Sequence, residues 1–270
     1  TMTRIEEGET PEVEKKCLEE LRQLLKGEAD LHATPSDDAL LMFLRARKYD
    51  VKKALKTIRN YFRVRRNMPE YFDNLTPSSI PYQEVFHDNK LIMQATERDS
   101  EGRAVGILKL GAWSTDICTM DNLMRCLLLA AECGLLEADA QIRGVVAVVD
   151  LQGLGAHHLM HLTPWFLRRI ITIAQDSLPA KIKGIYVVNT PAAAEVAISF
   201  VQFFLPTKLK RRLHLIGGGL SELRGVIPSE LIPKNCCGTQ EDFDFHRQEY
   251  SFLEKAGHFD NMRQCGYSRK

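Results

Sequence analysis

The sequence lacks the features of membrane-spanning and secreted proteins. No stretch approaches the roughly 18–20 uninterrupted apolar residues that a transmembrane helix needs. Residues Thr1 to Thr10 are polar and acidic, without the basic segment followed by an apolar segment that a signal peptide has. We therefore expect a cytoplasmic protein.

The sequence also lacks a disulfide framework and an evident zinc site. Its seven cysteines are odd in number, none of them forms a C-x-x-C motif, and Cys236 and Cys237 are adjacent. Reduced thiols in a cytosolic protein fit this pattern better than paired cystines. Adjacent cysteines are also poorly placed for tetrahedral zinc, so we expect no metal.

An excess of charge of one sign is missing too. The chain has 36 Lys and Arg against 35 Asp and Glu, which leaves a net charge of +1. The average charge therefore gives no reason to expect nucleic acid as a partner. A basic binding site must come from local clustering of cations.

Common catalytic motifs are absent as well. The segment Asp150–Gly155 follows a predicted strand, but His158 stands at the third glycine position of a dinucleotide loop, and no Walker A motif occurs. No G-x-S-x-G nucleophile motif is present. His157, His158 and His161 have no carboxylate or cysteine at ligand spacing. We expect no enzyme, with catalysis kept as the main alternative class.

What is present changes in pattern near residue 80. Before it, apolar spacing and N-cap residues predict three helices, at Pro11–Lys26, Asp37–Arg47 and Val51–Arg66. A cluster of turn-forming residues follows. This part of the chain shows no strand pattern.

After residue 80, strands alternate with helices. The elements predicted there are a hairpin of Leu91–Ala95 with Ala104–Leu110, helices at Met120–Ala140, Pro164–Gln175 and Pro191–Leu205, and strands at Val145–Leu151, Gly184–Asn189 and Leu213–Ile216. Val145–Leu151 (VVAVVDL) is continuously apolar up to Asp150, as expected of a strand covered on both faces. The order predicts an α/β fold, with a helical N-terminal subdomain and a mostly parallel sheet.

The predicted helix Pro191–Leu205 is unusually apolar. Its polar residues Glu195, Ser199 and Gln202 form one narrow stripe, whereas a surface helix needs an apolar arc of only about 100°. Two interpretations remain open: a helix buried in the core, or a lid with one face over a cavity and the other toward lipid. The cations of 208–212 that follow are either a membrane contact or a solvated helix end.

Seven segments together resemble the CRAL-TRIO family, and within it the branch of α-tocopherol transfer protein, the clavesins and retinaldehyde-binding protein. They occur in family order: DDALLMFLRARKYDVKKA (37–54), GRAVGILKLGAW (102–113), VVAVVDLQGL (145–154), LTP (162–164), QDSLPAKIKGIYVVNTP (175–191), FFLPTKLKRRLHLIG (203–217) and ELIPKNCCGT (230–239). The last segment departs from the family pattern at residues 235–238.

The resemblance implies a helical N-terminal subdomain (residues 10–80), a lipid-binding domain (81–250) and a C-terminal tail (251–270). It also implies a lipid cavity between helices and sheet, closed by the lid helix Pro191–Leu205. The positions that match cavity-lining positions of the family are Met124, Leu127, Ala131, Ala147, Leu154, Ile170, Ile173, Ala174, Ile182, Ile185, Ala194, Ala197, Ile198 and Val201. Their alternative is an ordinary core.

The resemblance further implies a phosphoinositide site formed by five cations, Arg47, Lys181, Lys183, Lys208 and Arg212. Converging guanidinium and ammonium groups suit paired phosphates. At about 1 kcal/mol per basic residue near an anionic surface, five of them contribute on the order of 5 kcal/mol.

The implied function is intracellular transfer of one hydrophobic small molecule, of the tocopherol or retinoid kind, with exchange at membranes containing phosphatidylinositol bisphosphate. We expect no cofactor besides this lipid and the headgroup, and transient contact with endosomal or other intracellular membranes. Leu127 and Ala131 stand where the tocopherol carrier has two hydroxyl residues, so we expect a largely apolar or differently placed lipid as cargo and weaker tocopherol selectivity. The alternative is a membrane-recruited trafficking scaffold.

Overall fold

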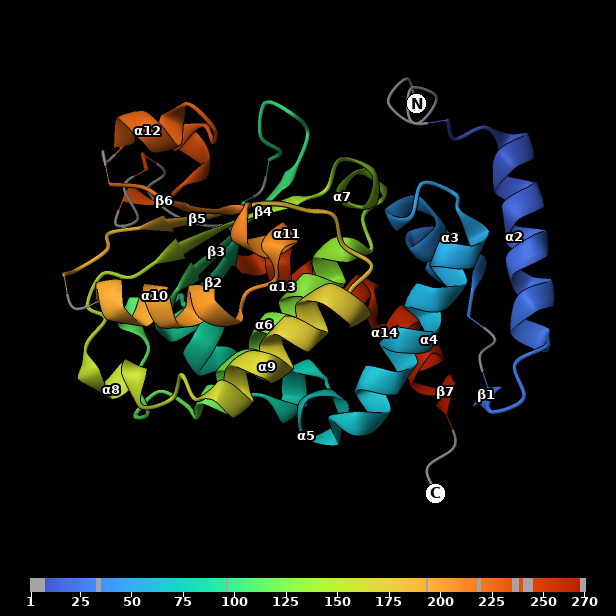
Figure 1. Cartoon of the computed structure of the whole chain (residues 1–270), viewed down its shortest axis with the longest axis horizontal. Coiled ribbons are helices and arrows are strands. Elements are labelled where there is room, and N and C mark those ends of the chain that lie inside the picture. Colours follow the sequence, from blue (N-terminus) through green and yellow to red (C-terminus); the bar gives the residue numbers. More distant parts are fainter. Residues whose placement is uncertain are drawn as a thin grey trace.

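The computed structural model describes residues 8–32, 35–95, 97–192, 194–217, 220–234, 238–239 and 245–267, and Figure 1 shows a helical part beside a sheet part. The helical part contains α2 (Pro11–Lys26), α3 (Asp37–Ala46) and α4 (Val51–Asn67). Each begins after a capping residue, Thr10, Ser36 or Asp50, whose side chain accepts a backbone N–H three residues later. All three helices were predicted, with ends that differ by at most one residue.

The sheet part is built on five strands in the order β2-β3-β4-β5-β6. Their bounds are β2 (Ile92–Gln94), β3 (Ala104–Lys109), β4 (Val145–Asp150), β5 (Ile182–Val188) and β6 (Leu213–Leu215). β2 and β3 form the predicted antiparallel hairpin, and the other neighbours pair in parallel. The predicted α/β class with a mostly parallel sheet is confirmed.

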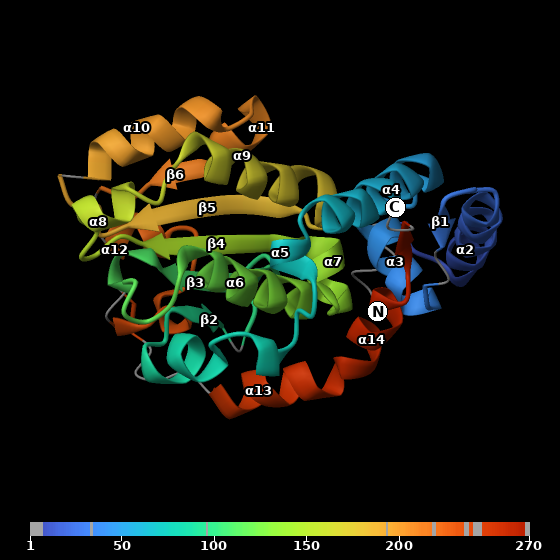
Figure 2. The same ribbon diagram turned by 90° about the horizontal axis from the view of Figure 1, so that it is seen from below.

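Helices cover this sheet on both sides (Figures 1 and 2). On one side lie α6 (Met120–Leu135), α9 (Pro164–Thr172) with the π-helical turn η4 (Ile173–Ser177), and α10 (Ala194–Phe204). On the other side lie α12 (Leu220–Arg224) and the turn η5 (Ser229–Leu231). Short helices connect these elements: α5 (Pro69–Phe72), α7 (Ala138–Arg143), α8 (Ala156–Leu159) and α11 (Thr207–Lys210).

The C-terminal segment contacts both the helical part and the sheet part. α13 (Phe245–Glu254) and α14 (Ala256–Arg263) run along the edge of the molecule, as Figure 2 shows. β7 (Gly266–Tyr267) then pairs with β1 (Leu31–His32) of the helical part. The Lys255 ammonium donates to the Cys133 carbonyl at 3.0 Å, which fixes this segment to α6.

One predicted helix is divided in two. The prediction of a single helix at Met120–Ala140 was wrong, because α6 ends at Leu135 and α7 begins at Ala138. Glu137 between them is extended, and the Gln141 side chain donates to the Leu135 carbonyl at 2.9 Å. A side chain of the second helix thus satisfies a free carbonyl at the end of the first.

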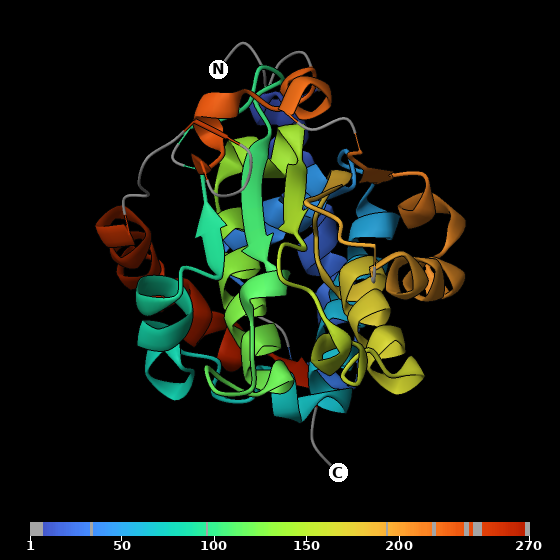
Figure 3. The same cartoon turned by 90° about the vertical axis from the view of Figure 1, so that its left-hand side faces the viewer.

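The sheet face toward α12 is filled with side chains. Its central row consists of Met93, Ile107, Val148 and Tyr186, all buried, on four neighbouring strands. Leu223, Ile227 and Ile232 from the α12–η5 region complete this cluster. We call it the filled face; Figure 3 shows α12 close to the strands.

The opposite face of the sheet, toward α6, α9 and α10, is less completely covered. The expectation that β4 is buried on both faces was therefore wrong. Along β4, buried residues alternate with half-buried ones: Val146, Val148 and Asp150 are buried, whereas Val145, Ala147 and Val149 are not fully covered. Successive residues of a strand point to opposite faces. Helix atoms therefore leave the face toward α6, α9 and α10 incompletely covered.

Candidate lipid-binding site

One row of residues crosses the sheet on this incompletely covered face, and we call it the open row. Direct register neighbours on all five strands belong to it, and each member is only half-buried: Gln94, Gly106, Ala147, Ile185 and Leu213. Apolar side chains in the middle of a helix-covered sheet are normally buried. The open row shows that the helices stand over the sheet without filling the space against it.

Two glycines, Gly106 and Gly111, differ in how closely other atoms pack against them. A Cβ atom added to Gly106, at the centre of β3, would meet no heavy atom within 4 Å. A Cβ added to Gly111, five residues later, would lie 2.3 Å from the Gln152 carbonyl oxygen. The space in front of Gly106 is therefore empty, while Gly111 is glycine because another backbone passes against it.

The predicted cavity-lining residues divide into two groups. Eight are half-buried and come from α6, β4, β5, the α9–η4 helix and α10: Leu127, Ala131, Ala147, Ile170, Ala174, Ile182, Ile185 and Val201. Six are buried: Met124, Leu154, Ile173, Ala194, Ala197 and Ile198. Ala147 and Ile185 are adjacent on the open row, and Met124 and Ile173 share one hydrophobic cluster. Their role in lipid binding stays a prediction.

The apolar helix predicted at Pro191–Leu205 is α10, Ala194–Phe204. Its inner side chains Ala194 and Ile198 pack on Leu151, Leu154 and Val187, at the carboxyl ends of β4 and β5. Ala193 lies outside the described residues. α10 therefore rests on the sheet by one side and is not enclosed on all sides by the core.

The outer side of α10 presents large apolar side chains to solvent. Val196 is 74% exposed and Phe203 is 81% exposed, and Phe200 is also exposed. Trp165, at the start of the neighbouring helix α9, adds a fourth exposed apolar group. Exposed aromatic and aliphatic groups gathered on one surface favour contact with lipid or with a partner. Within the described part of the chain, no helix is both long and apolar enough to cross a membrane.

Lys208 lies near two of the other predicted phosphoinositide-contacting cations, Arg47 and Arg212. Partial burial, then the positive charges of Arg212 and Arg47, lowers the pKa of the Lys208 ammonium. Such repulsion falls with distance, so it places Arg47 of the helical part close to α11 although 161 positions separate Arg47 from Lys208. The Arg47 guanidinium is held by a 2.7 Å hydrogen bond from its Nε to Thr57 Oγ1 on α4.

The other two predicted cations, Lys181 and Lys183, lie at the start of β5. The backbone N–H of Ile185 donates to the Arg212 carbonyl at 2.7 Å, which brings Arg212 against β5 two residues beyond Lys183. Lys183 is exposed. The Lys181 ammonium instead donates to the Ile142 carbonyl at 3.0 Å, so it faces the end of α7. The structure thus brings Arg47 and Arg212 near Lys208, whereas Lys181 faces the end of α7 and the Lys183 side chain passes beside Gly144.

The described histidines and cysteines are not grouped around a possible metal site. Among the described residues, no group of three or more His, Cys, Asp or Glu side chains is arranged to hold a metal ion. His158 is buried, and its Nδ1 accepts the Gly155 N–H at 3.0 Å, which is a structural role. The five described cysteines are free thiols, and Cys236 and Cys237 lie outside the described residues.

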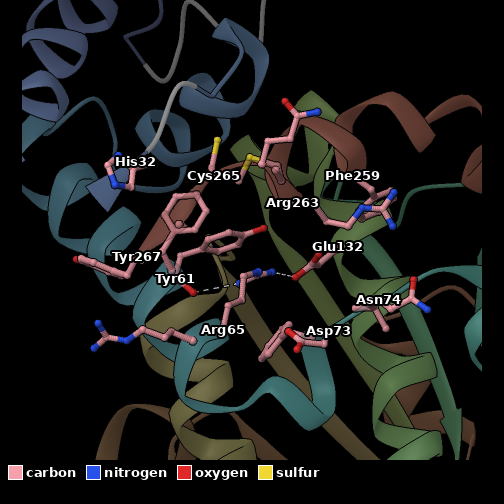
Figure 4. A pocket seen from close by; sticks show the side chains of 17 residues that line it. His32, Tyr61, Arg65, Asp73, Asn74, Glu132, Phe259, Arg263, Cys265 and Tyr267 are labelled. Atoms are coloured by element: carbon pink, nitrogen blue, oxygen red, sulfur yellow. Dashed lines mark hydrogen bonds and ion pairs between the residues drawn. The ribbon is translucent and has the colours of Figure 1, made fainter. Parts of the chain in front are cut away.

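A separate pocket of about 640 Å³ lies where α4, α6 and the C-terminal segment meet, and Figure 4 shows its lining. None of the predicted site residues lines it. Its charged groups already have partners: Arg65 pairs with Glu132 and lies 3.2 Å from the centroid of the Tyr61 ring, and Arg263 pairs with Asp260. We therefore assign this pocket to the junction of the two parts and not to the cargo.

Comparison with known families shows to which family the chain belongs. A family model described as CRAL/TRIO domain matches residues 88–238, more than half of the chain, and one described as Pinta-like, UBA domain matches residues 10–81. The chain belongs to the CRAL-TRIO family. Homologues in this family are lipid-binding and lipid-transfer proteins.

Individual CRAL-TRIO relatives agree with this assignment. Alpha-tocopherol transfer protein-like of Homo sapiens is 31% identical over 245 residues, which are 90% of this chain and 71% of the relative. Clavesin-1 of Mus musculus is 27% identical over 89% of this chain and 68% of its own length. The crystal structure of Sfh5 superposes with a TM-score of 0.58 at 15% identity, covering 93% of this chain and 99% of that one, and so shows the same fold.

Three members of the open row in this CRAL-TRIO domain were not predicted from the sequence: Gln94, Gly106 and Leu213. A signal existed for one of them, because an isolated glycine inside a strand pattern (AVGILK) often marks close approach of another group. Gln94 has no such signal. Its position opposite Gly106 follows only from the register of the hairpin.

Proposed function

We propose that the protein carries one hydrophobic lipid between α6, α9, α10 and the open row of the sheet. The open row is the observation that carries this proposal. A guest molecule there would cover Gly106, Ala147 and Ile185, which the protein's own side chains leave half-exposed. Burying about 400 Å² of apolar lipid surface yields roughly 10 kcal/mol, less the costs of association.

Release of such a cargo needs a compensating contact, and α10 supplies a candidate for it. In water, moving α10 away from Leu151, Leu154 and Val187 would expose both sides of an apolar helix. At a bilayer, the outer side chains Val196, Phe200 and Phe203 enter lipid, and the cost of opening falls. We infer that α10 acts as a lid that opens at membranes.

The cations around Lys208 support a preference of the protein for membranes that contain a phosphoinositide. The positive charges of Arg212 and Arg47 act on the Lys208 ammonium, and an anionic phosphate group beside Lys208 would offset this repulsion. We therefore infer that a bisphosphorylated phosphoinositide headgroup binds here, with Lys183 and, after a change of rotamer, Lys181. The protein then works in the cytoplasm and reaches endosomal or other intracellular membranes transiently, with no catalytic step. With Leu127 and Ala131 on the predicted wall, the cargo is less polar than tocopherol.

A transfer assay tests this proposal. Donor liposomes carry a fluorescent analogue of the co-purified lipid, and acceptor liposomes contain or lack phosphatidylinositol bisphosphate. We expect the headgroup to accelerate transfer and Lys208→Ala with Arg212→Ala to remove the acceleration. The matched control, Lys210→Ala with Arg211→Ala, removes two exposed cations from the same segment and should keep most of it.

Two outcomes would contradict the proposal. Equal rates for the double variant and the wild type would reject the role of the Lys208 group. Recruitment of the wild type to phosphoinositide liposomes without any transfer would instead favour a trafficking scaffold, the second function that the cation cluster supports.

A further inference from the structure

Helix α4 carries an unusual charge. Its 17 residues, VKKALKTIRNYFRVRRN, contain seven cations and no carboxylate, although the whole chain has a net charge of only +1. Arg65 is turned inward to Glu132. The other six lie on the surface side of the helix, opposite the buried residues that pack on α2 and α3.

These six cations form one stripe. Successive members are three or four positions apart, the spacing that places side chains on one helix face: Lys52 and Lys53, then Lys56, Arg59, Arg63 and Arg66. With a rise of about 1.5 Å per residue, the stripe is roughly 21 Å long. We call it the α4 stripe.

Internal partners neutralise only part of the α4 stripe. Lys53 pairs with Asp50 at 2.7 Å, Arg59 pairs with Glu28, and Arg66 lies over the Tyr267 ring. Within the described residues, Lys52, Lys56 and Arg63 pair with no carboxylate.

Repulsion within the α4 stripe lowers the stability of the folded chain when no partner is bound. Like charges at spacings of three and four repel one another along a helix. The first turn has no acidic residue and two lysines, Lys52 and Lys53, which oppose the helix dipole. Helix stability alone favours a mixture of charges, so this arrangement indicates an anionic surface that lies outside the chain.

The position of α4 indicates what that surface is. α4 lies on the same side of the molecule as α9, α10 and α11, as Figures 1 and 2 both show. Arg47, which repels Lys208 of α11, is hydrogen-bonded to Thr57 of α4. The helix that carries the stripe therefore lies beside Arg47, on the side of the molecule where α10 exposes its apolar face, and a cationic surface on the same side as an apolar helix fits the interface of a bilayer.

We propose that the α4 stripe is a second docking surface for anionic bilayers. It binds negatively charged lipid headgroups in general and does not require a phosphoinositide. This proposal rests on the proposed function in one respect, namely that exchange takes place at a membrane. Contacts at both α10 and α4 hold the molecule at two separate places, so the lid meets the bilayer in a defined orientation.

Vesicle binding tests the α4 stripe. The probes are phosphatidylcholine vesicles with and without phosphatidylserine, free of phosphoinositide, and the variant is Lys52→Gln with Lys56→Gln and Arg63→Gln. Each cation near an anionic surface strengthens binding about fivefold, so we expect a loss on the order of 100-fold at low salt. The control, Lys15→Gln with Lys16→Gln and Lys26→Gln, removes the same charge from exposed positions of α2, where acidic residues alternate with the lysines.

The outcomes separate the two proposals. Equal binding of the α4 variant and the wild type overturns the second docking surface and leaves the transfer mechanism standing. Failure of the wild type to bind either anionic or phosphoinositide vesicles overturns the membrane step of the proposed function as well. Binding of the wild type to duplex RNA but not to phosphatidylserine vesicles, lost in the α4 variant, overturns the assignment to a bilayer.

Discussion

The two faces of the central sheet carry similar residues and are packed differently. On the filled face, Val148 lies among Ile107, Tyr186 and the side chains of the α12 region, and all are buried. On the other face, Ala147 lies among Gly106 and Ile185, and all are half-exposed. The composition of a strand therefore does not reveal which face holds a core and which one holds a space. Packing against the helices decides it.

The largest expected contrast concerns the two glycines. Gly111→Ala places a Cβ atom 2.3 Å from a backbone oxygen, so the structure must shift, and we expect a loss of about 3 kcal/mol in the free energy of unfolding. Gly106→Ala places its Cβ in open space and should change stability by less than about 0.5 kcal/mol, or raise it. Urea denaturation measures both. Similar losses for the two variants would mean that the space before Gly106 is filled.

A smaller contrast concerns adjacent valines of β4. Val148→Ala removes methyl groups from the filled face, and we expect a loss of about 2 kcal/mol. Val149→Ala removes them from the half-covered side and should cost less than about 1 kcal/mol. The same denaturation experiment compares them. A larger loss for Val149→Ala would contradict the assignment of the two faces.

The smallest effect is a dependence on pH. Burial, followed by the charge of His157, lowers the pKa of the His158 imidazole. The unfolded chain then binds more protons than the folded one below about pH 6.5, so stability is full above that pH and falls as the pH decreases. His258 acts in the same direction, because burial and the nearby Arg65 lower its pKa.

Replacement of His158 checks this dependence. Between pH 7 and pH 5, we expect the free energy of unfolding of His158→Gln to fall less than that of the wild type. The slopes of this free energy against pH differ between the two proteins by at most about 1.4 kcal/mol per pH unit. An unchanged slope would show that His158 titrates alike in both states.

Much of the fold could be predicted from local patterns. Thr10, Ser36 and Asp50 mark the starts of α2, α3 and α4 because their side chains cap free N–H groups, and this chemistry is visible in the sequence. The parallel strands β4 and β5 also stand out as β-branched runs.

Other features depend on contacts that no local pattern contains. The break between α6 and α7 depends on Gln141 reaching back to the Leu135 carbonyl. The pairing of β1 with β7 joins segments of two residues each from opposite ends of the chain.

The candidate site was predictable in part. Apolar composition singles out α10, but its exposed outer face and packed inner face appear only in the structure. The proximity of Arg47 to Lys208 followed from family resemblance and not from spacing. The half-covered side of β4 was not foreseen, since a valine beside an empty space and a valine in a core are identical in sequence.

The proposed transfer requires that the space before the open row holds a lipid. Native mass spectrometry of the purified chain tests it most directly, followed by organic extraction to identify what was bound. We expect an added mass corresponding to one hydrophobic molecule per chain. A chain that stays free of lipid after incubation with a total lipid extract, and keeps its full stability, would contradict the claim.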